Sequence, residues 1–323
     1  MSPESYKTLL EKNIHKEYKT STIETVEHIE KEDAEIAKLF DIEDRVHKTT
    51  KKEAFITIKD HKENFKNNPQ CRLINPTKQE LGKAAKKVIE ELNVKLKKVT
   101  NHNQWKNDSE VIDWFVNQKQ KHSKNFVQWD IDSFYPSITE ELLQEALDWA
   151  ETLLDISEND KKLIFQTKKS LLFNEGQPWV KKGNKFFDNT MGSFDGAEVC
   201  ELIGLFLLHR LSVNGVNDVG LYRDNGLGAL KLTPRQMEQT KKTIRRVFEE
   251  HGLKITIEAN KKTIDFLDVT FDLTLGTYKP YSKPNTKHLY VHTKSNHPPG
   301  ILKTWPKELI QDFQQFHAMK KFL

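Results

Sequence analysis

Two short acidic segments, 94 residues apart in the sequence (224 − 130), constrain the fold of this 323-residue chain more than any other feature. The first runs from Trp129 to Ile138 and the second from Gly220 to Leu227. In each, one aspartate (Asp130 or Asp224) stands where an apolar, strand-like run meets a turn or a helix start. If the two strands are neighbours in one sheet, the two carboxylates form an oxygen-ligand site of the kind that binds Mg²⁺ together with substrate phosphates. Two metal ions in such a site stabilise both the attacking and the leaving oxygen of an in-line phosphoryl displacement.

The uneven distribution of charge indicates a phosphate-bearing partner. The formal net charge is only +4, but residues 51–106 hold 14 Lys or Arg against 6 Asp or Glu, whereas residues 1–50 hold 8 against 12. A basic block next to a more acidic segment suits a partner rich in phosphate. The alternative is a solvated helical face, which the charge pattern alone does not exclude.

Composition excludes several other classes of protein. Only Cys71 and Cys200 are present, so the chain has neither a disulfide framework nor a cysteine-rich zinc module. No run of about 18 apolar residues occurs, and the charged N-terminus does not have the form of a secretory signal. We therefore expect an intracellular protein, of the cytoplasm or the nucleus, with no membrane partner.

Local sequence patterns predict a mixed α+β chain. Residues 3–48 have the composition of charged helices, and strands over 54–58 and 71–74 flank a polar loop as a long hairpin. Further helices are predicted, in chain order, over 78–98, from a capping box at Ser137–Glu140, over 157–172, over 190–210, and from Thr233 to Gly252. Two more strands are predicted over 253–258 and 266–273, the second from the alternation of apolar and polar residues.

The order of these elements and motifs resembles a reverse transcriptase of a retroelement, of the Penelope-like type. The resemblance covers roughly residues 54–305. Its motifs are, in chain order, Ile58–Lys62, Cys71–Pro76, Asp130–Tyr135, Thr190–Ser193, Tyr222–Asn225 and Phe266–Val269. Each motif alone is weak evidence, whereas their joint order is specific.

The resemblance implies a right-hand polymerase, an α+β fold with fingers, a palm built on an antiparallel sheet, and a partial thumb. Residues 1–50 would form an N-terminal helical extension and residues 51–128 the fingers. Residues 129–275 would form the palm, with an intervening fingers or helical segment near 155–190. Residues 276–323 would hold the end of the primer-grip strand and the partial thumb. No endonuclease module is visible, and a thumb this short should reduce processivity.

The family's metal ligands fall on the two acidic segments. Asp130 and Asp224 match the metal-binding aspartates, and the carbonyl of Ile131 matches a further ligand. The implied cofactor is Mg²⁺ or Mn²⁺. The family has a second aspartate after the one at the turn, and here that residue is Asn225, a neutral donor with one negative charge less. Polymerases of negative-strand RNA viruses carry Gly-Asp-Asn at this place, so Asn225 by itself does not imply an inactive chain.

The resemblance also implies a set of nucleotide-binding residues. Lys59, Lys62 and Arg72 match the fingers residues that grip the triphosphate. The alternative is a solvent-facing ion-pair ladder, which suits Lys62 better than Arg72, because Arg72 interrupts an apolar strand. Tyr135 matches the aromatic residue that excludes a ribose 2′-OH by occupying its space, with a core aromatic as the alternative.

Two later segments complete the implied site. Gly192 and Ser193 match the segment whose glycine lets template and nucleotide approach the backbone, although a glycine before a helix would look the same. Segments Gly252–Lys254 and Lys261–Thr263 both resemble the one that bears the lysine that protonates the leaving pyrophosphate. Such proton donation contributes about 10²- to 10⁴-fold in rate. Between the two segments we favour Lys262.

The expected activity is template-directed addition of deoxynucleotides to a primer 3′-OH, with an RNA template, a DNA primer and dNTPs as partners. The main alternative is a catalytically degenerate polymerase fold that binds nucleic acid, which Asn225 and the short thumb motivate. A DNA-templated polymerase is a second alternative, because the spelling from Asp130 to Ile138 also occurs in DNA polymerases of family B. The segments around Arg72 and Gly192 favour the reverse transcriptase.

Overall fold

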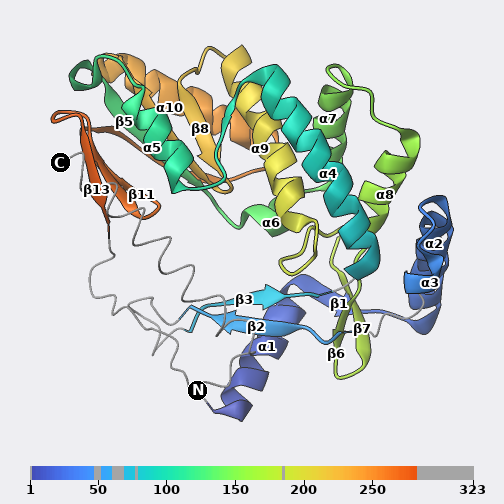
Figure 1. The fold of residues 1–323 in the computed structure, drawn as a ribbon. Helices are drawn as coiled ribbons and strands as arrows, with labels where there is room; N and C mark the ends of the chain where they lie inside the picture. Colours follow the sequence, from blue (N-terminus) through green and yellow to red (C-terminus); the bar gives the residue numbers. More distant parts are fainter. Residues whose placement is uncertain (1, 47–51, 60–68, 77–78, 184–185, 282–323) are drawn as a thin grey trace, which may run out of the picture.

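A five-stranded sheet lies at the centre of this computed structural model, which describes residues 2–46, 52–59, 69–76, 79–183 and 186–281 (Figure 1). The strand order is β10-β5-β9-β8-β4. The bounds are β4 Asn103–Gln104, β5 Asn125–Ile131, β8 Val219–Tyr222, β9 Asn225–Leu230 and β10 Ile255–Lys261. All neighbours pair antiparallel except β4, which pairs parallel to β8. The two segments that the sequence singles out therefore meet on the adjacent strands β5 and β9.

The described residues form ten α-helices and one short 3₁₀ helix, Lys121–Ser123. The bounds of the α-helices are α1 Pro3–Glu17, α2 Ile23–Leu39, α3 Glu43–Val46, α4 Gln79–Thr100, α5 Asp108–Val116, α6 Phe134–Ser137, α7 Glu140–Glu151, α8 Glu158–Lys168, α9 Gly196–Val213 and α10 Pro234–Glu250. Helix α9 packs against α4, α7 and α10, and it is apolar nearly all round because helices and the sheet surround it.

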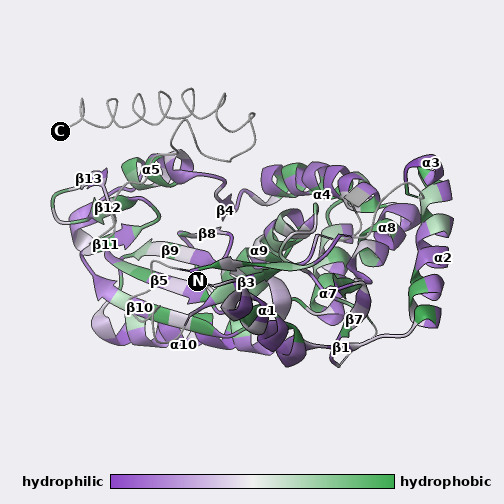
Figure 2. Ribbon diagram, turned by 90° about the horizontal axis from the view of Figure 1, so that it is seen from below, coloured by the Kyte–Doolittle hydropathy of each residue, from purple (hydrophilic) through white to green (hydrophobic). Residues whose placement is uncertain are grey.

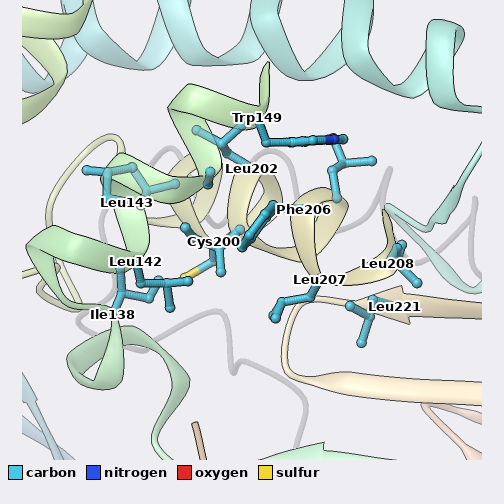
Figure 3. Close-up of a cluster of buried hydrophobic side chains, with 14 of the residues drawn as sticks. Ile138, Leu142, Leu143, Trp149, Cys200, Leu202, Phe206, Leu207, Leu208 and Leu221 are labelled. Atoms are coloured by element: carbon cyan, nitrogen blue, oxygen red, sulfur yellow. The ribbon is translucent and has the colours of Figure 1, made fainter. Parts of the chain in front are cut away.

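The main core lies between the sheet and these helices. Trp129 of β5 and Leu221 of β8 are buried in it. Figure 3 shows the same core around α7 and α9, where Leu143 and Trp149 lie near Phe206. A second buried cluster lies on the other face of the sheet, where Phe126 of β5 is buried with the aromatic residues of α5 and β12. Both faces of the sheet are thus covered over much of its length. Asp130, near the end of β5, is exposed.

Three smaller sheets lie outside the central one. Their strands are β1 Tyr18–Thr20, β7 Gln177–Lys181 and β6 Leu172–Asn174 in the first, β2 Phe55–Ile58 and β3 Cys71–Ile74 in the second, and β11 Thr263–Phe266, β12 Val269–Asp272 and β13 Thr277–Pro280 in the third. Helix α1 crosses beneath the β2–β3 hairpin (Figure 1), and its Leu10 and Ile14 are buried with Ile56 of β2.

Several local predictions are confirmed. The hairpin over 54–58 and 71–74 forms as β2 and β3, and the helix predicted over 78–98 forms as α4. Helix α10 begins at the predicted capping box, in which the Thr233 and Gln236 side chains each bond the other residue's backbone N–H. Gly252 follows the end of α10 with a φ of +72°, the left-handed conformation that terminates many helices.

Three other local predictions are wrong. The predicted capping box at Ser137 is not formed: Ser137 ends α6, and Thr139 caps α7 by accepting from the N–H of Leu142. The helix predicted to reach residue 172 ends at Lys168, because Leu172 begins β6. The strand predicted over 266–273 is a hairpin of β11 and β12, since Leu267 has a φ of +54° and turns the chain. In the last two cases strand pairing overrode a local pattern.

The surface helices alternate hydrophilic and hydrophobic stripes, as α2 and α4 do in Figure 2. Across the described residues, none of the helices has the length and hydrophobicity needed to cross a bilayer.

Candidate active site

Asp130 lies one residue before the end of β5, on the exposed end of the central sheet. It pairs with Asn225 of β9 on one side and with Thr256 of β10 on the other. Paired residues on antiparallel strands project from the same face of a sheet, so these three side chains share one face. Asp130 and Thr256 are exposed, and Asn225 is half-buried.

The tight turn between β8 and β9 brings the second aspartate to the same place. Tyr222 pairs with Asn225, which leaves Arg223 and Asp224 as a two-residue loop. The N–H of Ile131 donates to the carbonyl of Asp224 at 2.9 Å. Because the N–H and C=O of a strand residue point to the same neighbouring strand, the carbonyl of Ile131 also faces this turn. Asp130, Ile131 and Asp224 are therefore brought together.

Asn225 acts on Asp224 directly. Its side-chain nitrogen Nδ2 donates to Oδ1 of Asp224 at 3.0 Å. A hydrogen bond to an ionised carboxylate fixes the orientation of that carboxylate. Asn225 thus contributes a hydrogen-bond donor to Asp224 and brings no second negative charge to the turn.

A close packing contact sets the separation of the two strands. Gly226 of β9 faces Trp129 of β5, and a Cβ built on Gly226 would lie 1.9 Å from Cε2 of the indole. Real Cβ contacts are never this short, so only glycine allows the indole to lie flat against β9 at this position. The glycine after Asp224-Asn225 therefore lets β5 and β9 pair while Trp129 stays in the core.

The donor set is suited to a hard divalent cation. Asp130 and Asp224 offer carboxylate oxygens and Ile131 offers a carbonyl, which are the ligand types that Mg²⁺ prefers. Within the part of the chain that the structure describes, no group of three or more His, Cys, Asp or Glu could hold a metal ion. Mg²⁺ is commonly held through one or two carboxylates together with waters and substrate phosphates, and the two aspartates fit that pattern.

Tyr135 lies in α6, the single turn that follows β5. The chain reaches it through Ser133, whose φ is +50°. A Cβ built on Gly196 would lie 3.4 Å from Cε1 of Tyr135, so the ring lies against the first turn of α9. Burial is the main reason that the pKa of Tyr135 is raised to about 12; the nearby Cys200 contributes in the same direction and Arg223 in the opposite one. The side chain is therefore a neutral phenol at neutral pH.

Gly192 and Ser193 lie just before α9, against the end of β3. Gly192 has a φ of +108°, and a Cβ on it would lie 2.7 Å from Cγ2 of Ile74 and 3.1 Å from the carbonyl oxygen of Asn75. Any other residue would therefore be strained and would also collide with β3. The hydroxyl of Ser193 donates to the carbonyl of Thr190 at 3.1 Å, which closes this turn.

The β2–β3 hairpin carries two of the three predicted phosphate-gripping residues, and Lys62 lies outside the described residues. Arg72 pairs with Thr57, and both are exposed on the face of the hairpin opposite to Ile56. Arg72 thus interrupts an apolar strand without being buried. Lys59 is half-buried directly after β2, and its N–H donates to the carbonyl of Gln70 at 2.8 Å.

The structure does not bring Lys262 to this site. Its ammonium donates to the carbonyls of His122 and Lys124, just before β5 begins. Six residues of strand separate Lys124 from Asp130, which is about 20 Å at the usual rise per residue. Lys254, in the other segment that sequence analysis left open, lies at the Asp130 end, where its carbonyl accepts from the N–H of Asp132 at 2.9 Å.

A buried ion pair behind the site was missed by sequence reasoning. The ammonium of Lys168 lies 2.8 Å from Oδ1 of Asp195, and the two side chains are 0% and 1% exposed. The hydroxyl of Thr167 donates to the other carboxylate oxygen at 2.7 Å, and Lys168 also donates to Asn189. This pair fixes the start of α9, next to Ser193. A lysine in the last turn of a helix usually faces solvent near the carbonyls, so the sequence carried no signal of its burial.

Comparisons with known proteins identify the fold. No protein-family model matches the chain, and no curated protein matches it by sequence. Many solved structures resemble it at low sequence identity, and three of them show the range. Telomerase from Candida albicans, in complex with a fragment of telomeric RNA, is 11% identical, with a TM-score of 0.56 over 86% of this chain and 50% of that chain. Telomerase from Candida tropicalis, in a similar complex, is 12% identical, with a TM-score of 0.55 over 98% and 52%.

The third structure is viral. The RNA polymerase complex inside a double-stranded RNA virus is 11% identical, with a TM-score of 0.50 over 74% of this chain and 23% of that chain. The chain spans about half the length of the telomerase chains. Its α+β architecture is that of the right-hand polymerases, as the sequence resemblance implied.

Proposed function

We propose that this chain is an RNA-directed DNA polymerase, which adds deoxynucleotides to a primer 3′-OH under the direction of an RNA template. The observation that carries the proposal is the meeting of Asp130 and Asp224 at one exposed end of adjacent strands, with the Ile131 carbonyl beside them. The likeness to telomerase, a reverse transcriptase solved with telomeric RNA, supports an RNA partner.

The acidic end of the sheet suits a polymerase metal centre. Asp130 and Asp224, with the carbonyl of Ile131, would hold Mg²⁺ or Mn²⁺. When bound, these ions supply charge neutralisation to the phosphates and to the attacking and leaving oxygens. Asn225 holds the Asp224 carboxylate in one orientation, so this ligand needs no rearrangement when substrate arrives.

The nucleotide would lie between this end of the sheet and the hairpin. Arg72 is exposed and Lys59 half-buried on or next to the hairpin, where guanidinium and ammonium groups can bind a triphosphate. Tyr135 presents a neutral phenol that would occupy the space of a ribose 2′-OH. Gly192 has no side chain to collide with Ile74 and Asn75, so its turn can lie against the end of β3, at the base of the hairpin.

In the reaction, the primer 3′-hydroxyl loses its proton to water, and its oxygen forms a bond to the α-phosphorus as the bond from this phosphorus to the pyrophosphate oxygen breaks. A lysine that gives a proton to the departing pyrophosphate must lie near Asp130. Lys254 meets this condition through its backbone bond to Asp132, whereas Lys262 lies about 20 Å along the strand. We therefore assign the general-acid role to Lys254.

Primer extension on an RNA template, with dNTPs and Mg²⁺, tests the proposal. The wild-type chain should extend the primer, and Asp130→Ala and Asp224→Ala should abolish extension. The exposed aspartate Asp148, on α7, provides a control: Asp148→Ala should extend like the wild type. Extension that survives Asp130→Ala would refute the proposed role of the acidic site. Matched RNA and DNA templates separate a reverse transcriptase from a DNA-templated polymerase.

A second candidate function is nucleic-acid binding without catalysis. Asn225 favours it, because the turn carries one carboxylate where the resembling polymerases carry two. The variant Asn225→Asp separates the two functions. If only this variant extends a primer, while the wild type binds a primer–template duplex without Mg²⁺, the chain is a binding protein with a polymerase fold. Extension by the wild type excludes this alternative.

A further inference from the structure

The turn that carries Tyr135 is too short to hold its own position. Helix α6 has only four residues, and at its end the N–H groups of Ser137 and Ile138 donate to the carbonyls of Ser133 and Tyr135 at 3.2 and 3.3 Å. Isolated single turns are unstable because nucleation costs more than one or two hydrogen bonds return. The last carbonyls of such a turn also have no helical partner. Something outside α6 must therefore fix it.

Lys181, at the end of β7, supplies one external contact. Its ammonium donates to the carbonyl of Pro136 at 2.9 Å, directly after Tyr135. A cation at the carboxyl end of a helical turn bonds the carbonyls that would otherwise lack a donor. Phe134, the first residue of the turn, and Ile138, the residue after it, are each 2% exposed in the main core. The backbone of Tyr135 is thus held by two apolar anchors and one ammonium group.

Buried polar partners fix the ammonium itself. Lys181 lies 2.8 Å from Oδ1 of Asp188, whose side chain is 1% exposed. The other carboxylate oxygen accepts a short hydrogen bond from the hydroxyl of Tyr18. Tyr18 is buried, and burial together with the Asp188 carboxylate raises its pKa, so the hydroxyl keeps its proton and remains a donor. The chain of contacts runs Tyr18, Asp188, Lys181, Pro136.

Tyr18 comes from the N-terminal segment, which the sequence presented only as a helical extension. It begins β1 and pairs with Lys181 of β7. Helix α1, just before it, contacts the β2–β3 hairpin: the hydroxyl of Tyr6 accepts from the N–H of Ile56 at 3.0 Å. The segment from α1 to β1 therefore touches both the hairpin that carries Arg72 and the network that holds the Tyr135 turn.

We propose that Lys181 is a positioning residue for sugar selection: it sets the location of the Tyr135 ring, and the buried carboxylate of Asp188 and the hydroxyl of Tyr18 hold it in place. The inference rests on the proposed function, in which Tyr135 excludes a ribose 2′-OH. Rejection of one hydroxyl requires a wall fixed to a fraction of an ångström, since a displacement of about 1 Å can cost a hundredfold in a positioned reaction.

The test compares the efficiency (kcat/KM) of dNTP and rNTP incorporation. Lys181→Met should lower the dNTP-to-rNTP ratio by about tenfold or more, while Lys181→Arg, which keeps the charge, should restore part of it. Lys182→Met is the matched control. Lys182 is the next residue, and its ammonium also donates to main-chain carbonyls, but to those of His15 and Lys16 in α1. Its ratio should equal that of the wild type.

Two further variants make the result specific. In a Tyr135→Ala background, Lys181→Met should change the ratio no further, because the two residues would act through one surface. Tyr18→Phe removes one hydroxyl and should lower the ratio in the same direction by a smaller factor, which keeps the proposal testable if Lys181→Met does not fold. An unchanged ratio in folded Lys181→Met, or an additive effect with Tyr135→Ala, would overturn the proposal.

Hydrogen exchange provides a readout that needs no activity. The amides of Ser137 and Ile138 should exchange faster in Lys181→Met than in the wild type or Lys182→Met. If the wild type incorporates no nucleotide of either kind, the proposed function fails, and exchange alone then decides whether Lys181 positions the turn. Unchanged exchange at both amides would refute that positioning role as well.

Discussion

The contact between Gly226 and Trp129 makes a strong prediction, because it couples core packing to the geometry of the acidic site. A Cβ at Gly226 would lie 1.9 Å from the indole of Trp129, whereas ordinary contacts begin near 3.4 Å. Gly226→Ala therefore requires a relative displacement of about 1.5 Å (3.4 − 1.9). The indole is 1% exposed and packs edge-on against Phe248, so it cannot swing into solvent.

The expected loss of stability in Gly226→Ala follows from this lack of room. Overpacking of a buried site costs about 1–3 kcal/mol, and we expect Gly226→Ala to lie near the upper end of that range. Urea unfolding should give a lower midpoint with an unchanged slope. Since β9 also carries Asn225, displacement of the strand should separate it from Asp130 and reduce primer extension by more than the loss of folded protein explains.

Two controls make the reasoning refutable. Gly82→Ala, on α4, would place its Cβ 3.3 Å from Cβ of Phe194, so that residue must shift by a few tenths of an ångström. Phe194 is 40% exposed and has room to shift, and alanine favours a helix by up to about 1 kcal/mol. The variant should be neutral or stabilising. Trp129→Phe should relieve part of the cost of Gly226→Ala, giving a favourable coupling in a double-mutant cycle. A Gly226→Ala chain as stable as the wild type, or no coupling with Trp129→Phe, would refute the packing argument.

Three other predictions concern groups around the site. Lys168→Met should lower the free energy of unfolding by about 3–5 kcal/mol in urea, because it leaves the buried Asp195 without its ion-pair partner. The double variant Lys168→Met with Asp195→Leu should recover most of that loss, whereas a mild effect of the single variant would contradict the burial of the pair. The pKa of Tyr135 is raised to about 12, mainly by burial, from a usual value near 10, so its neutral form stabilises the fold fully below about pH 10 and this contribution is lost as the pH rises through about 12. Tyr135→Phe should therefore lose less stability than the wild type at alkaline pH, and identical pH profiles of unfolding free energy would contradict this prediction. Lys254→Ala should lower the rate of extension by about tenfold or more and Lys262→Ala should not, as single-turnover kinetics would measure; the reverse order would return the general-acid role to Lys262.

Much of the local structure could be predicted from short-range patterns. The Thr233–Gln236 capping box and the hairpin strands formed where their residue types indicated, because caps and alternation depend on neighbours in sequence. Patterns failed where a distant partner decided the outcome. Leu267 interrupts an apolar alternation with a left-handed φ, since β11 and β12 pair with each other.

The candidate site, too, could be predicted from the sequence only in part. The two acidic segments mark strand ends by their own residue types, and the resemblance implied that they meet. Which lysine lies beside them depends on the register of β10 against β5, a relation between segments more than 100 residues apart. Both predicted segments contain a lysine, and nothing local distinguished Lys254 from Lys262.

What the sequence determined by itself was the order of the motifs, the residues that we propose to bind a metal or a phosphate, and several of the local caps and turns. Tertiary structure alone decided which charges are buried. Lys168 and Lys181 look like ordinary surface lysines in the sequence, yet each is held by a buried aspartate. The physical reason is that a charge can be buried only where a partner of opposite charge and further hydrogen bonds compensate its loss of water. Those partners come from other elements of the fold, so no local pattern can reveal them.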